Sequence, residues 1–78
     1  MSPKVQQVTR IDILRAAKKF KNARAAKWTV IVEGEELPAR PLVLAAADAN
    51  PMDPTNSHEA VRKLKELGFA IRYDGTPA

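Results

Sequence analysis

A helix, a glycine stop and a strand follow one another without interruption near the end of the chain, and this unit constrains the fold most. Ser57 is the predicted N-cap, because its hydroxyl can accept a hydrogen bond from an amide two or three residues further on. Gly68 can adopt the left-handed conformation that ends a helix, and Phe69 to Tyr73 then alternates with the period of a strand. The apolar residues of the helix recur at spacings of three and four and form one stripe: Ala60, Val61, Leu64 and Leu67.

A second capped helix is predicted to begin at Thr9, because Asp12 follows three residues later as in a capping box. Its apolar residues share one face and most of its basic residues share the opposite face. The helix is expected to end near residues 22–23, since Arg24 would otherwise fall on the apolar side. Residues 1–8, which precede it, are expected to form a flexible arm.

Between these helices the sequence predicts a β-hairpin and a short helix. Lys27 to Glu33 alternates as a strand, and residues 34–35 form the natural turn. Pro38 lies in the return strand, Glu36 to Arg40, and cannot donate to a sheet ladder, so this strand is expected at an edge. Pro41 fits the first position of a short helix that continues through alanine-rich residues.

The order helix, strand, strand, short helix, helix, strand predicts a small α+β domain over residues 9–74. A three-stranded antiparallel sheet should carry the helices on one face, and residues 75–78 should fray. Trp28, Phe69 and Tyr73 are expected in the core, with base stacking as the alternative for Trp28. A proline in the edge strand opposes pairing between chains and favours a monomer.

Several classes of function are not expected. The 78 residues include no cysteine and a single histidine, so neither a thiolate site nor a histidine-rich metal site is predicted, and no cofactor is expected. Ser57, His58 and Glu59 are consecutive, but adjacent helical residues point in different directions, so no catalytic set and no enzyme is expected. The absence of a long apolar run and of a signal-peptide pattern predicts a cytoplasmic protein without a membrane partner.

Charge is divided unevenly along the chain, whose net charge is +4. Residues 1–27 contain eight basic residues against Asp12 alone, whereas residues 28–78 contain five basic and eight acidic residues. A basic segment on an acidic body indicates an anionic partner. The preferred hypothesis is nucleic acid bound at its phosphates; the alternatives are a solvated helix face and a basic surface that docks on an acidic protein. The candidate contacts are Arg15, Lys18, Lys19, Lys21, Arg24, Lys27 and Arg40.

Arg40 is stiffened by Pro38 and Pro41, and a rigidly held arginine can contact a phosphate or a base. It could equally pair with Glu33 across the hairpin. Both roles are consistent with the sequence.

Two stretches also resemble a known family. The first runs Trp28-x-Val30-x-Val32, then Gly34, then Leu37-Pro38-Ala39-Arg40, and the second runs Arg62-x-x-Leu-x-x-Leu67-Gly68-Phe69-x-Ile71. In this order they resemble the N-terminal modules of McrA-type HNH restriction endonucleases, which include the DNA sulfur-binding domains. The resemblance implies a DNA-binding module, with DNA preferred over RNA. The alternative that docks on an acidic protein would suit a bacterial or phage accessory protein.

The departures from that family narrow what the resemblance implies. Leu37 stands where the family has an aromatic residue, and residues 53–57 replace its Phe-Ser-Gly-Gly stretch. Recognition of phosphorothioate is therefore not carried over. Arg40 alone occupies a position that matches the basic residue of the family motif.

Overall fold

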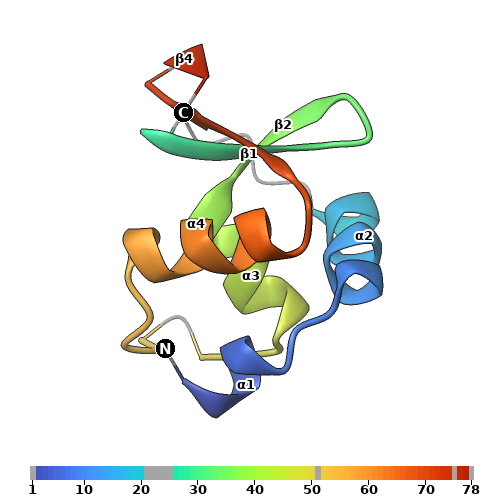
Figure 1. Ribbon diagram of the computed structural model, residues 1–78. Coiled ribbons are helices and arrows are strands. Elements are labelled where there is room, and N and C mark those ends of the chain that lie inside the picture. Colours follow the sequence, from blue (N-terminus) through green and yellow to red (C-terminus); the bar gives the residue numbers. More distant parts are fainter. Residues whose placement is uncertain (1, 21–25, 51, 75, 78) are drawn as a thin grey trace.

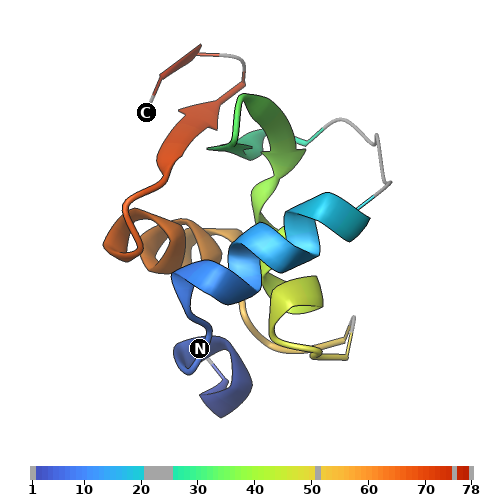
Figure 2. The ribbon, with the colours of Figure 1, turned by 90° about the vertical axis from the view of Figure 1, so that its right-hand side faces the viewer.

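The computed structural model describes residues 2–20, 26–50, 52–74 and 76–77, and it has the predicted α+β architecture (Figure 1). A sheet forms one layer, and the helices lie against one of its faces in both views (Figures 1 and 2). The elements are α1 (Pro3–Gln6), α2 (Arg10–Lys19), β1 (Trp28–Val32), β2 (Glu35–Pro38), α3 (Ala39–Ala46), α4 (Ser57–Glu66), β3 (Ala70–Tyr73) and β4 (Thr76–Pro77).

The sheet is antiparallel throughout, with the strand order β2-β1-β3-β4. Three of its strands were predicted. The fourth, β4, pairs with β3 where the sequence suggested fraying. As Pro38 predicts, β2 lies at an edge of the sheet.

The hairpin turn lies one residue earlier than predicted. Val32 pairs with Glu35, which leaves Glu33 and Gly34 as a two-residue loop. Both have positive φ, 50° and 82°, as a type I′ turn requires. The pairing register, which the sequence alone did not specify, therefore decides where the turn falls.

The unit around α4 has the predicted construction, with a shift of one residue at its start. The N-cap is Asn56 rather than Ser57: Asn56 Oδ1 accepts from Glu59 N at 2.8 Å, and Glu59 Oε1 accepts from Asn56 N at 3.2 Å. At the other end Gly68 has φ 90°. Phe69 N donates to Leu64 O at 3.1 Å and Gly68 N donates to the Lys65 carbonyl at 3.0 Å, which is a Schellman motif.

The capping box of α2 is also confirmed, because Thr9 Oγ1 accepts from Asp12 N and Asp12 Oδ2 accepts from Thr9 N. The helix ends at Lys19, before the predicted residues 22–23. Phe20 leaves the helix with extended backbone, ψ 116°, and packs against the core. The predicted last turn, at residues 21–23, lies outside the described residues.

The segment before α2 is not a loose arm where the structure describes it. Ser2 caps α1, and Pro3 occupies the first helical position. Val5 is fully buried and Val8 nearly so. Ser-Pro ahead of an apolar residue is a helix-start signal, but the segment is too short to show apolar periodicity.

The core fills the space between the inner face of the sheet and the helices. Val30, Val32 and Ile71 come from the strands, and α3 is its central helix, with Leu42 and Val43 completely buried. α3 begins at Ala39, earlier than predicted, so Pro41 takes its third position. Arg40 consequently lies in the first turn of a helix instead of in a strand.

Candidate nucleic-acid interface

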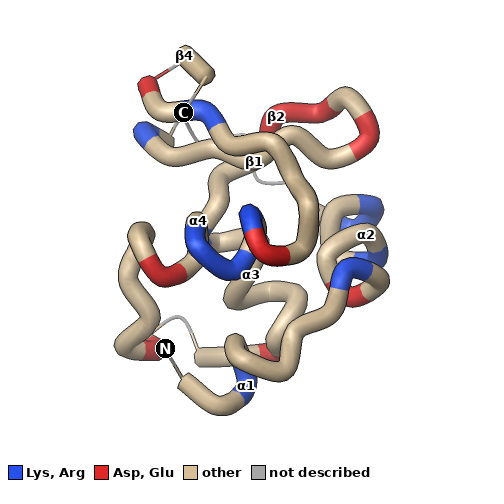
Figure 3. The backbone as a smooth tube through the Cα atoms, viewed as in Figure 1, with Lys and Arg blue, Asp and Glu red and all other residues tan. Residues whose placement is uncertain are grey.

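The exposed face of α2 carries three cations. Lys18 and Lys19 lie three and four residues after Arg15, so the three side chains are neighbours on the helix surface. Within the described residues neither lysine forms an ion pair. The Thr9 backbone and hydroxyl hydrogen bonds, with a smaller contribution from Arg15, hold the pKa of Asp12 below its usual value. We call Arg15, Lys18 and Lys19 the α2 basic face. Figure 3 colours the Lys and Arg positions along α2 blue.

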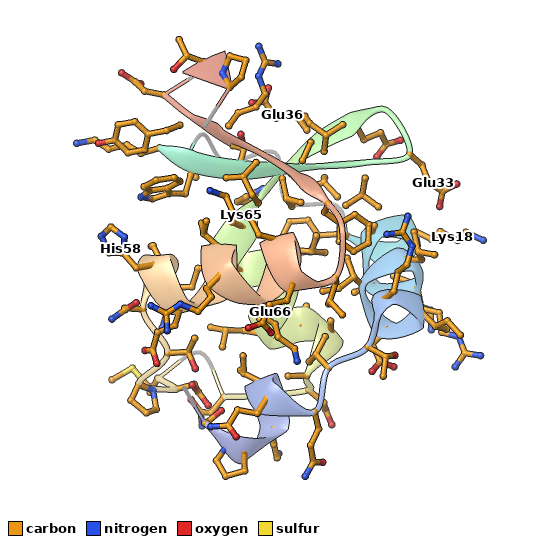
Figure 4. The ribbon with its side chains drawn as sticks, in the orientation of Figure 1. Lys18, Glu33, Glu36, His58, Lys65 and Glu66 are labelled. Carbon is orange, nitrogen blue, oxygen red and sulfur yellow. The ribbon has the colours of Figure 1, made fainter. Side chains whose placement is uncertain are left out.

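Acidic residues border this face on the side of the hairpin. A hollow of about 350 Å³ between α2 and the hairpin is lined by Lys18 on one side and by Glu33 and Glu35 on the other. Lys18 and Glu33 lie on the same side of the molecule (Figure 4). Among the described residues, Glu33 and Glu35 therefore reduce the positive potential of the α2 basic face on the side of the hairpin.

A second candidate surface lies where β1 begins. Trp28 and Tyr73 are cross-strand partners, and their ring centroids are 4.5 Å apart. His58, in the first turn of α4, meets Trp28 edge-on with centroids 5.7 Å apart. The helices begin to cover the inner face of the sheet only at this end of β1. Trp28 and Tyr73, the aromatic pair at this end, are therefore only partly covered by the helices.

A hollow of about 410 Å³ opens beside this cluster, and we call it the Trp28 concavity. It is lined by Ala26, Lys27, Trp28, Arg40, Pro41, Asn56, Ser57 and His58. Trp28 packs against the core yet remains half-buried, so it lines the concavity as well. The core prediction is confirmed for Phe69 and is wrong for Tyr73, which is 40% exposed.

Arg40 fastens a loop at the rim of the Trp28 concavity. Its Nε donates to Thr55 O at 2.7 Å, and one Nη donates to Asp53 O at 3.0 Å. Thr55 is almost completely buried, and its hydroxyl donates to Asp53 Oδ1 at 2.6 Å. Thr55 N also donates to Asp53 Oδ1, at 2.9 Å, and these two hydrogen bonds from Thr55 hold the pKa of Asp53 below its ordinary value of 3.8. Arg40 thus stabilises this loop through its hydrogen bonds and also places positive charge at the Trp28 concavity.

The structure divides the predicted contacts into separate groups. Arg15, Lys18 and Lys19 form the α2 basic face, whereas Lys27 and Arg40 line the Trp28 concavity. α2 and the start of β1 lie on opposite sides in Figure 1, as do the labelled Lys18 and His58 in Figure 4. The remaining predicted contacts, Lys21 and Arg24, lie outside the described residues.

The aromatic cluster was missed because it depends on register. Trp28 opens a strand and Tyr73 ends one, but only antiparallel pairing of β1 with β3 brings them opposite each other. The position of His58 in the first turn of α4 could be read from the capping signal, but its packing on Trp28 could not.

Two chemical features can be stated for the described part of the chain. It holds no group of three or more His, Cys, Asp or Glu residues that could bind a metal ion. None of its helices combines the length and apolarity needed to cross a bilayer.

Comparison with protein-family models, with curated proteins and with solved structures gives no match.

Proposed function

We propose that this protein is a small, non-enzymatic nucleic-acid-binding domain that contacts the phosphate backbone through α2 and the loop that follows it. The observation that carries the proposal is the α2 basic face, with three neighbouring exposed cations on one helix. A helix face of this kind tracks a phosphate backbone without reading its sequence. The preference for DNA over RNA comes from the motif resemblance to McrA-type modules.

The proposal sets an expected salt dependence. Each lysine or arginine that contacts a phosphate releases condensed counterions from the nucleic acid. With about five such contacts, since Lys27 and Arg40 lie apart from α2, the logarithm of the binding constant should fall with the logarithm of salt concentration at a slope of about −5. Such a slope separates phosphate contacts from binding that buries apolar surface.

The test is a titration of labelled duplex at several salt concentrations, with two charge-matched double variants. Lys18→Ala with Lys19→Ala should weaken binding to all sequences alike and make the slope shallower by about two units. Arg62→Ala with Lys65→Ala removes the same charge from the exposed surface of α4 and should leave the slope nearly unchanged. Absence of binding at low salt, or binding that salt does not affect, would refute the proposal.

One observation favours a second candidate function, docking on another protein. Glu33 and Glu35 face Lys18 across the hollow beside α2, and surfaces of mixed charge suit a complementary protein better than a phosphate backbone. Glu33→Ala with Glu35→Ala discriminates between the two. The change removes like-charge repulsion and should strengthen DNA binding several-fold at low salt if phosphates pass beside Lys18. An unchanged DNA affinity would favour protein docking.

A further inference from the structure

The Trp28 concavity combines an aromatic surface with positive charge. Lys27 and Arg40 bring two cations to it, and none of the described residues that line it is acidic. This contrasts with the hollow beside α2, where Glu33 and Glu35 oppose Lys18. Charge complementarity therefore favours an anionic occupant for the Trp28 concavity.

The dimensions and walls of the concavity suit a flat aromatic group. Its volume of about 410 Å³ falls within the range of small-molecule sites, about 300–1,000 Å³. Trp28 contacts the Tyr73 ring and forms a T-shaped pair with His58, and both contacts favour one orientation of its ring before any ligand binds. The Ser57 hydroxyl and the His58 imidazole, which also line it, can hydrogen-bond to the edge of a base.

We propose that the Trp28 concavity takes an unpaired nucleobase, which stacks on Trp28 while Lys27 and Arg40 attract the adjoining phosphates. A base has a π-face and its strand carries one negative charge per nucleotide, so one ligand satisfies both features of the site. Arg40 contributes through its charge, since its Nε and one Nη already bind loop carbonyls. The domain should accordingly prefer single-stranded segments over fully paired duplex.

This inference deepens the proposed function, because both require nucleic acid, but it rests on other residues. Stacking at the Trp28 concavity does not depend on Lys18 or Lys19, and phosphate contacts at the α2 basic face do not depend on Trp28. The two can therefore fail separately.

Trp28 is the only tryptophan in the chain, so its fluorescence reports on the site directly. The protein is titrated with a thymine-rich single-stranded DNA oligonucleotide, with the fully paired duplex of the same sequence, and with inorganic polyphosphate. Excitation at the red edge of indole absorption avoids a contribution from Tyr73. We expect the single strand to quench the emission to a saturating level, and the duplex and polyphosphate to leave it nearly unchanged. Equal quenching by polyphosphate, or no quenching at saturating single strand, would overturn the inference.

Variants supply a second measurement by anisotropy of the labelled single strand. Trp28→Leu should weaken binding roughly 5- to 150-fold, the effect of losing one stacked base, whereas Trp28→Phe should retain part of the affinity. Circular dichroism establishes whether each variant is folded. If a variant is unfolded, the quenching of the unmodified protein by the single strand tests the inference instead. Folded Trp28→Leu with undiminished affinity for the single strand would contradict the proposal.

The Lys18→Ala, Lys19→Ala protein separates the two hypotheses in the same experiment. If it binds the single strand more weakly but is quenched to the same final level, both hypotheses are supported. Unchanged affinity with full quenching would refute the role of the α2 basic face and leave the Trp28 site standing. Weaker binding without quenching in either protein would refute the Trp28 site and leave the α2 basic face standing.

Discussion

Leu64 lies in the middle of the apolar stripe of α4 and is completely buried. Truncating a buried leucine to alanine costs roughly 2–5 kcal/mol, and a domain of this size has a free energy of unfolding at the low end of about 5–15 kcal/mol. We therefore expect Leu64→Ala to be largely unfolded in a circular dichroism melt. Lys18→Ala with Lys19→Ala, two exposed positions, should stay within about 0.5 kcal/mol of the parent. Parent-like melting of Leu64→Ala would mean that the stripe is not the centre of the core.

The two described glycines with positive φ, Gly34 and Gly68, allow the cost of backbone strain to be separated from the cost of a close side-chain contact. Gly68 has φ 90°, and a Cβ there would lie 3.1 Å from Arg10 Nη1; Gly34 has φ 82° with no atom within 4 Å. Arg10 Nη1 donates to Leu67 O at 2.8 Å, and its guanidinium stacks over the Phe69 ring. Both alanine variants pay about 1–2 kcal/mol for the left-handed backbone.

Gly68→Ala should therefore cost more than Gly34→Ala, because the Arg10 guanidinium would also have to shift by a few tenths of an ångström from its contacts with Leu67 and Phe69. Urea unfolding of the two variants gives the difference directly. Equal losses of unfolding free energy would show that the contacts of Arg10 with Leu67 and Phe69 contribute little to stability.

For single residues, the sequence predicts those structural roles that depend on neighbours close by in the chain. Gly68 and Leu64 could be assigned because a helix stop and an apolar stripe are local patterns. Arg40 could not be assigned, since its partners Asp53 and Thr55 lie 13 and 15 residues away and meet it only in the folded chain. The exposure of Tyr73 likewise depends on where the helix layer starts.

The capping box of α2 makes that element sensitive to acid. The hydrogen bonds from Thr9 hold the pKa of Asp12 below its ordinary value of 3.8 in the folded protein. At higher pH the carboxylate is ionised in both states and its stabilising contribution is complete. As pH falls through 3.8 and then through the lower folded pKa, the unfolded state takes up its proton first and the contribution is lost.

We expect the free energy of unfolding, measured in urea, to fall over this interval, and to fall less steeply in Asp12→Asn, which cannot titrate there. Asp48→Asn is the matched control, because the Asp48 side chain forms no hydrogen bond among the described residues. Identical acid dependence of Asp12→Asn and the parent would show that the cap does not distinguish the ionised from the neutral carboxyl.

Element boundaries show which local signals decide a helix start. Asn56 and Ser57 are both good N-caps, so residue type alone does not choose between them. The choice follows from Glu59, which stands three residues after Asn56 and can return a hydrogen bond to it. The hairpin turn had no comparable signal, because Glu33 in a left-handed conformation is unusual for its residue type.

For the molecule as a whole, the distribution of charge along the chain differs from its distribution in space. The basic first third predicts a separate basic surface, but folding places Glu33 and Glu35 beside Lys18, and it carries Lys27 to the far side with Arg40. The fold class could be predicted because the order of the helices and strands, and the hydrophobic periodicity that identifies each of them, are properties of the sequence that folding does not change. The candidate sites could not be placed, since each joins residues from elements that meet only through tertiary packing.

The segment before α2 contributes two buried side chains, Val5 and Val8, to the core of the whole molecule. Val5 of α1 is fully buried, α1 packs on α4, and Lys63 Nζ donates to Gln6 O at 2.7 Å. Val5→Ala removes two methyl groups and leaves a cavity, so it should lower the free energy of unfolding by about 2–3 kcal/mol. Gln7→Ala, at an exposed position of the same segment, should change it by less than about 0.5 kcal/mol. Urea unfolding measures both, and removal of residues 1–8 should destabilise the domain more than Val5→Ala does, because Val8 is lost as well. A Val5→Ala protein as stable as the parent would mean that this segment only rests on the surface of a core completed without it.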